Sequence, residues 1–166
     1  RMSLVIDKSG IYYDAHTSND LEARLQSIEL DEAQRQRIVD ILVRLKHNPV
    51  SKYNHGSVHL PISVQASKAG RKIQLVDQTY GDMSIALGMA HEGDFKAMLD
   101  YALAQFPNAD IFIKTHPDVV AGRKRGHFDL NNLPSSVHVI SENVRTGTLV
   151  AVMDHVLVVT SQMGFD

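Results

Sequence analysis

The sequence contains no cysteine, which excludes a fold held together by disulfide bonds and is consistent with a reducing compartment. It has no apolar run near the roughly 20 residues that a membrane-spanning helix needs, which argues against an integral membrane segment. It also has little excess of charge. The formal net charge is −2, and we therefore expect no general nucleic-acid-binding function.

The 166 residues, 43% of them hydrophobic, suffice for the core of one domain or slightly more. Near the start, residues 4–7 and 11–13 are strand-like and flank a turn-forming Lys-Ser-Gly, which predicts a turn or a hairpin. Helices are predicted from Ser18-Asn-Asp to residue 27 and over residues 31–47. Residues 48–70 are polar and rich in turn formers, so we interpret them as a linker.

After this linker the pattern alternates between strands and helices. Apolar runs at residues 73–76, 111–113, 137–140 and 156–159 predict four strands. A helix is predicted over residues 93–106, and Thr146 is a candidate N-cap for a shorter one. The alternation predicts an α/β fold with a Rossmann-like parallel sheet and flanking helices over residues 71–166, preceded by a hairpin and helical connecting segment over residues 1–70.

Each predicted strand runs into a polar cluster, and in a parallel sheet these ends share one edge, where open α/β proteins bind ligands. The first strand leads into Asp77-Gln-Thr-Tyr-Gly-Asp82 and the second into Lys114-Thr-His-Pro-Asp118. The third leads into Ser141-Glu-Asn143 and the fourth into Thr160-Ser-Gln-Met-Gly164. We therefore expect one site built from four strand ends.

The carboxylates of the first cluster have two interpretations. An Asp after a strand often caps the next helix, and this accounts for Asp77 or Asp82 about as well as a catalytic role does. In the functional interpretation Asp82 is a nucleophile or base, Asp77 supports it, and Gly81 lets a ligand approach the backbone.

The other clusters supply binding groups. Lys114 and His116 could hold a phosphate or protonate a leaving oxygen, with Pro117 stiffening the turn, although a single His is more often structural. Ser161 and Gln162 begin a helical turn that is either an anion site or a plain cap. Glu142 is a candidate partner for a ribose.

Three cations, Arg123, Lys124 and Arg125, lie in a loop between two glycines. Such a run is usually a solvated surface. In a chain of net charge −2, however, cations close to His116 can also receive an anionic substrate, and this interpretation is slightly favoured.

Taken in order, the segments at residues 3–14, 77–82, 114–118, 122–127 and 160–165 resemble the bacterial capsule polysaccharide β-Kdo transferases. The resemblance covers nearly the whole chain. It implies half of a two-Rossmann-domain (GT-B) glycosyltransferase that transfers Kdo from CMP-Kdo, with retention, to a Kdo-linked lipid acceptor during capsule linker synthesis and export. It implies no metal or other cofactor.

The resemblance also assigns roles. The family's Gln-x-x-x-Asp pattern falls on Gln78 and Asp82, which makes Asp82 the nucleophile of a covalent intermediate. The His-Pro pair falls on His116 and Pro117, so His116 would contact the CMP phosphate and assist its departure. Ser161 and Gln162 would hold the same phosphate. The charges of the basic loop, independently of the resemblance, suggest that Arg123, Lys124 and Arg125 bind the acceptor or another anion.

Further expectations concern the surroundings of the protein. The family's upstream acidic segment is missing, as is the helix expected after residue 165, so we expect a piece truncated at its C-terminal end, whose activity in isolation is an open question. The resemblance implies a cytoplasmic location, with peripheral association at the inner membrane and contact with capsule-assembly proteins as further expectations.

Two other functions stay open. One is a metal-dependent phosphoesterase with Asp77, Asp82, His116 and His127 as ligands, although tight ligand spacing such as His-x-x-x-His is absent. The other is a non-catalytic module that binds a nucleotide.

Overall fold

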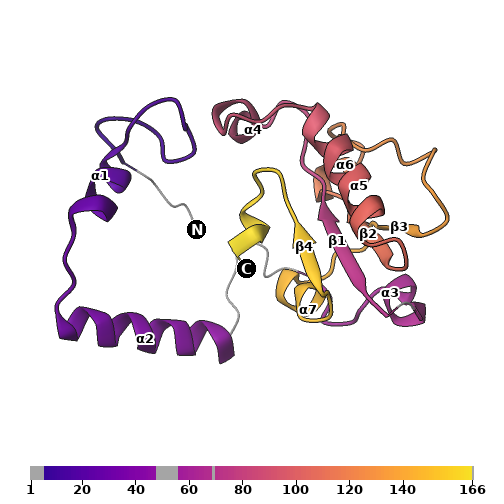
Figure 1. Cartoon of the computed structure of the whole chain (residues 1–166), viewed down its shortest axis with the longest axis horizontal. Helices are drawn as coiled ribbons and strands as arrows, with labels where there is room; N and C mark the ends of the chain where they lie inside the picture. The colour runs from indigo at the N-terminus through magenta and orange to yellow at the C-terminus, as the bar shows by residue number, and fades with distance from the viewer. Residues whose placement is uncertain (1–5, 48–55, 69, 166) are drawn as a thin grey trace.

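The computed structural model describes residues 6–47, 56–68 and 70–165 (Figure 1). Four strands and seven α-helices are present in these ranges, with a 3-10 turn at the end. The helices are α1 (Asp20–Ser27), α2 (Glu32–His47), α3 (Ile62–Ala66), α4 (Met83–Leu87), α5 (Gly93–Gln105), α6 (Pro117–Val120) and α7 (Thr146–Val150). The strands are β1 (Lys72–Val76), β2 (Asp110–Lys114), β3 (Val137–Ile140) and β4 (His155–Leu157), and the turn is η1 (Gln162–Phe165).

The four strands form one parallel sheet in the order β3-β2-β1-β4. Ile73 of β1 pairs with Ile111 of β2 on one side and with His155 of β4 on the other. The predicted Rossmann-like parallel sheet is therefore confirmed. Since the chain builds outward from β1 to β3 and then returns to the other side of β1, the strand order reverses between β1 and β4, which is where such sheets bind ligands.

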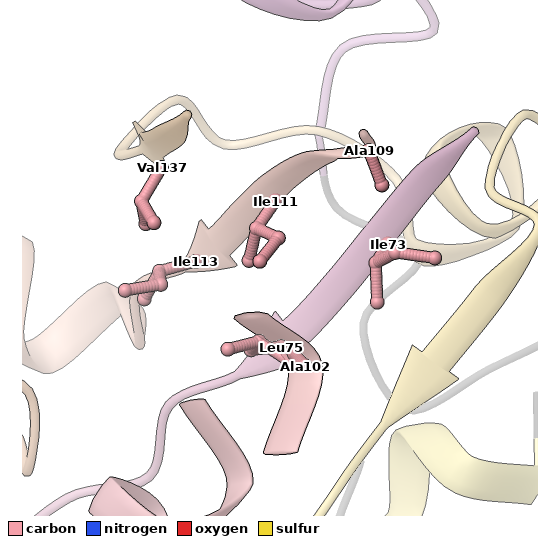
Figure 2. Packing of buried hydrophobic residues seen from close by; sticks show 7 residues of the cluster. All are labelled: Ile73, Leu75, Ala102, Ala109, Ile111, Ile113 and Val137. Atoms are coloured by element: carbon pink, nitrogen blue, oxygen red, sulfur yellow. The ribbon is translucent and has the colours of Figure 1, made fainter. Parts of the chain in front are cut away.

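The core has two layers because successive side chains of a strand point to opposite faces of the sheet. On one face, Ile73, Leu75, Ile111 and Ile113 pack against Ala102 of α5 (Figure 2). On the other face, a second cluster contains Phe112 and Ile140 from the sheet, Val64 of α3 and Leu149 of α7. Helices on both faces hide the sheet from water, as its nearly continuous apolar strands require.

The two N-terminal helices differ from the rest of the molecule. Asn19 caps α1 as predicted, its side-chain oxygen accepting from the Glu22 N–H at 2.9 Å. Neither α1 nor α2 buries a residue, and Figure 1 shows α2 lying apart from the sheet. Within the described ranges, no helix combines the length and apolarity needed to cross a bilayer.

The predicted N-terminal hairpin is wrong where the structure describes it. Residues 11–13 form a turn closed by the Asp14 N–H and the Ile11 carbonyl at 2.9 Å. The Asp7 carboxylate accepts from the N–H groups of Ser9 and Gly10, so it offers this segment a local alternative to strand pairing. Residues 4 and 5 of the other predicted strand lie outside the described residues.

The interpretation of residues 48–70 as a linker is also wrong in part. Ile62–Ala66 forms α3, and Val64 is only 2% exposed because it packs into the second core cluster. Ser57 makes a parallel bridge with Val144, which ties this segment to the sheet domain. The cap of α7 differs too, since Thr146 is its first residue and Arg145 holds the cap position without a side-chain hydrogen bond. The division of the chain at residue 70 stays a prediction.

Candidate functional site

A pocket of about 910 Å³ opens at the carboxyl edge of the sheet. Its wall combines residues that follow all four strands, so the predicted convergence of the strand ends occurs. Of the residues proposed from the sequence, those that line it are Asp77, Gln78, Asp82, Lys114, His116, Pro117, Ser161 and Gln162.

Asp82 has both of the roles that the sequence allowed. It is the N-cap of α4, and its Oδ1 accepts from the Ser84 N–H at 3.0 Å and from the Ser84 hydroxyl at 2.9 Å. Partial burial acts to raise the pKa of Asp82, but the hydrogen bonds from Ser84 outweigh it, and the pKa lies below the usual value. Asp82 is thus an ionised carboxylate, and within the described ranges its Oδ2 has a single long contact, 3.5 Å from Gln78 Nε2.

Gln78, which follows β1, connects this strand to the segment after β4, across the point where the strand order reverses. Its Oε1 accepts from the Thr160 N–H at 3.1 Å, and its Nε2 donates to the Thr160 hydroxyl at 2.9 Å. The Thr160 hydroxyl also lies 3.2 Å from that of Ser84. Since Gln78 is 4% exposed, this network is fixed in place, and it orients the amide that reaches Asp82.

His116 is held as one tautomer. Its Nδ1 accepts the Asp118 N–H at 3.1 Å at the start of α6, so the proton of a neutral ring is on Nε2. Burial lowers the pKa of His116, against the opposing charges of Asp118 and Asp77. Pro117 follows at the first helical position, where its missing N–H leaves no bond unmade. The ring therefore offers a single N–H donor.

Lys114 and Thr115 add polar groups beside His116. Burial lowers the pKa of Lys114, opposed by the charge of Glu142, and its Nζ donates to the Thr115 carbonyl at 2.9 Å. Thr115 is 2% exposed, and its hydroxyl has no hydrogen-bond partner among the residues that the structure describes. Glu142 is exposed and does not line the pocket, so the structure places it near Lys114 and not in the pocket wall.

Ser161, one of the proposed phosphate-binding residues, lies before η1, and its hydroxyl accepts from the Met163 N–H at 3.3 Å.

Other wall residues were not proposed from the sequence. Thr160 and Ser84 take part in the Gln78 network, which only the fold reveals. Tyr12 and Tyr13 reach the pocket from the N-terminal turn, and their aromatic pair within a predicted hairpin gave no signal for a site.

The three cations of the basic loop differ in their contacts, and none lines the pocket. Arg123 pairs with Asp118 at 2.6 Å. The Arg125 guanidinium lies 5.3 Å from the centre of the Tyr80 ring, a cation–π distance. Lys124 makes no ion pair in the part of the chain that the structure describes. Binding of an acceptor by all three stays a prediction.

The ligand set proposed for a phosphoesterase is not assembled. In the described ranges, no group of three or more His, Asp or Glu side chains is placed to hold a metal ion. The His127 ring instead stacks on Phe95, with the ring centres 4.0 Å apart.

Three solved or curated proteins show what the chain is similar to. KpsC of Thermosulfurimonas dismutans, described as a beta Kdo 2,4 transferase, shares 38% identity with a TM-score of 0.82, over 96% of this chain and 49% of that one. LipA of Neisseria meningitidis serogroup B, a capsule polysaccharide modification protein, is 36% identical over 99% of this chain and 24% of its own length. LpsZ of Rhizobium meliloti, a lipopolysaccharide-processing protein, is 26% identical over 99% of this chain and 38% of its own length.

The chain thus spans half or less of the length of these relatives. A beta Kdo 2,7 transferase structure of the same KpsC matches with a TM-score of 0.62 at 22% identity, which supports the fold alone. The sequence model of the capsule polysaccharide biosynthesis protein family matches residues 49–166, which include the whole sheet and the pocket wall apart from Tyr12 and Tyr13. With its α/β fold and its homology to a β-Kdo transferase, the chain belongs to the capsule polysaccharide biosynthesis protein family.

Proposed function

We propose that this chain is the donor-binding module of a retaining β-Kdo transferase, which moves Kdo from CMP-Kdo to a Kdo-linked lipid acceptor in capsule linker synthesis. One observation carries the proposal. An ionised carboxylate with an open oxygen, Asp82, lines the same pocket as a neutral imidazole with one N–H, His116. Transfer of a sugar from a phosphate needs a nucleophile on one side of the anomeric carbon and, on the other side, a hydrogen-bond donor that stabilises the departing phosphate.

In the first step, Asp82 Oδ2 gives an electron pair to the anomeric carbon of Kdo. The bond from that carbon to the phosphate oxygen breaks, and CMP leaves with the bonding pair. His116 Nε2–H donates a hydrogen bond to the phosphate, where negative charge accumulates. Ser161 and Gln162 hold the same phosphate, and Lys114 adds a positive charge beside it.

In the second step, the acceptor hydroxyl attacks the same carbon and its proton passes to solvent. The bond to Asp82 breaks and the carboxylate is restored. Two displacements at one carbon give net retention. Ser84 serves both steps, because its N–H and hydroxyl bind Oδ1 whether Asp82 is a carboxylate or an ester. Oδ2 is thereby the oxygen left to react.

Intact-protein mass spectrometry tests the proposal. The full-length protein is incubated with CMP-Kdo and no acceptor, and one Kdo residue should add to the peptide containing Asp82. CMP binding without an adduct or turnover would support the non-catalytic module instead. An adduct on any other residue would refute the assignment of the nucleophile.

A further inference from the structure

The basic loop, residues 122–127, is attached to the pocket wall by the buried carboxylate of Asp77, which has no part in the proposed reaction. Asp77 is 3% exposed, and its Oδ1 accepts the His127 N–H at 3.0 Å. Burial raises the pKa of Asp77, opposed by this hydrogen bond. Burying a carboxylate costs free energy unless hydrogen bonds compensate for it, and Asp77 makes such a bond to a loop 50 residues along the chain.

The glycine before His127 belongs to the same contact. A Cβ at Gly126 would lie 2.2 Å from Asp77 Oδ2, far inside contact distance. The loop can approach the carboxylate this closely only because residue 126 has no side chain. Asp77 and Gly126 are therefore complementary in shape as well as in hydrogen bonding.

Four more contacts fix the loop. The Tyr80 N–H donates to the Arg125 carbonyl at 2.7 Å. The His127 ring stacks on Phe95 of α5 and lies 5.6 Å from the Tyr80 ring. Nearer the start of the loop, the Lys124 N–H donates to the Asp118 carbonyl at 3.1 Å.

Lys124 lies in the middle of this fixed segment, next to the wall residue Asp118. The pKa values of Asp82 and His116 are set mainly by burial and by nearer hydrogen bonds and charges. The positive charge of Lys124 is a smaller cause that lowers both pKa values. Its neighbours in the loop have other contacts, since Arg123 forms an ion pair with Asp118 and Arg125 a cation–π contact with Tyr80. Among the described residues, Lys124 is thus the cation of the loop that makes neither an ion pair nor a cation–π contact, and it lies next to the pocket wall at Asp118.

We infer that Asp77 is a positioning residue that, together with Gly126, locks the basic loop so that Lys124 is held next to Asp118, at the rim of the pocket, for the anionic sugar. The inference rests on the proposed function and extends it. The substrate class follows from the chemistry, since the anomeric carbon of Kdo bears a carboxylate. A group that attacks this carbon has that carboxylate as a close neighbour, and Lys124 is placed to bind it.

Asp77→Ala and Asp77→Asn separate positioning from other roles. Asn keeps an oxygen that accepts the His127 N–H, whereas Ala removes it. We expect Asp77→Ala to lower kcat about ten- to a hundred-fold, as misplacement by about 1 Å does, with the Kd for CMP unchanged because CMP lacks the sugar carboxylate. Asp77→Asn should retain kcat within about threefold of wild type.

Gly126→Ala approaches the same lock from the loop side, with Gly70→Ala as the matched control because a Cβ there meets nothing within 4 Å. Gly126→Ala should reproduce the kcat loss of Asp77→Ala. If Asp77 acts through Lys124, the double variant Lys124→Ala with Asp77→Ala should have the same kcat as Lys124→Ala alone. Equal inactivity of Asp77→Asn and Asp77→Ala would overturn the inference in favour of a chemical role. Unchanged kcat with only a lower Tm would overturn it in favour of a purely structural one.

Limited trypsin digestion provides a readout without turnover, because the loop carries Arg123, Lys124 and Arg125. Asp77→Ala and Gly126→Ala should be cut in the loop several-fold faster than wild type, and Asp77→Asn at the wild-type rate. Equal cleavage of all variants would refute the lock. If wild type transfers no Kdo, the proposed function fails while this comparison still decides the lock.

Discussion

Asp82 combines a structural and a chemical role in one side chain, and two substitutions should separate them. Asparagine is as good an N-cap as aspartate, because its side-chain oxygen can accept the Ser84 N–H. Alanine removes the cap of α4 and should cost about 1 kcal/mol. For a chain of this size, that corresponds to a fall in Tm of about 2–4 °C for Asp82→Ala, and close to none for Asp82→Asn.

The rate should respond differently. Both variants lack the ionised Oδ2 that attacks the sugar, and an amide oxygen or a methyl group cannot replace it. We expect each to lower kcat by at least about a thousand-fold and to abolish the Kdo adduct. Asp82→Asn should thus have native stability without activity.

Thermal unfolding followed by circular dichroism measures the first effect, and single-turnover transfer from CMP-Kdo measures the second. Asp100→Asn is the matched control, because Asp100 is exposed on α5 and lies outside the pocket. It should leave both the rate and the Tm unchanged. Transfer by Asp82→Asn at a rate near that of wild type would refute the assignment of the nucleophile. A Tm unchanged in Asp82→Ala would refute the capping argument.

Three further predictions follow from the same pocket. His116→Ala should weaken CMP binding about ten- to a hundred-fold in calorimetry, as loss of a hydrogen bond to a charged group does, and wild-type affinity would remove His116 from the site. EDTA should leave Kdo transfer unaffected, whereas loss of activity would favour the metal-dependent phosphoesterase. Because the pKa of Asp82 is lowered on folding, its charge stabilises the protein above the unfolded value near 3.8, and this is lost as the pH falls through the folded pKa. Wild type and Asp82→Asn should therefore be equally stable at neutral pH, and wild type should become the less stable of the two as the pH falls below about 4; an unchanged difference across this range would contradict this.

The sheet was predictable because buried parallel strands are marked by local sequence. Apolar runs such as residues 73–76 and 111–113 have few alternatives to a strand buried on both faces. The convergence of their polar ends follows from parallel pairing alone. Asp82, His116 and Ser161 could therefore be placed in one pocket before any contact was known.

The failures occurred where local and distant interactions compete. The apolar run at residues 11–13 suggested a strand, but on either side of it the carboxylates of Asp7 and Asp14 accept backbone N–H groups and so favour turns. The composition of residues 48–70 is typical of a linker, yet Val64 is buried against Phe112, nearly 50 positions along the chain. Such burial depends on tertiary packing, which the composition of a short segment does not record.

The network around Gln78 explains why the site itself could be predicted only in outline. Gln78 and Thr160 are 82 residues apart, and each is an ordinary polar residue in its own segment. They meet only because β4 returns to the side of β1 opposite β2. A sequence pattern can identify Gln78 as a partner of Asp82, four residues away, but the residue that orients its amide is decided by strand order. Specificity at this pocket is therefore a property of the fold as much as of the motif.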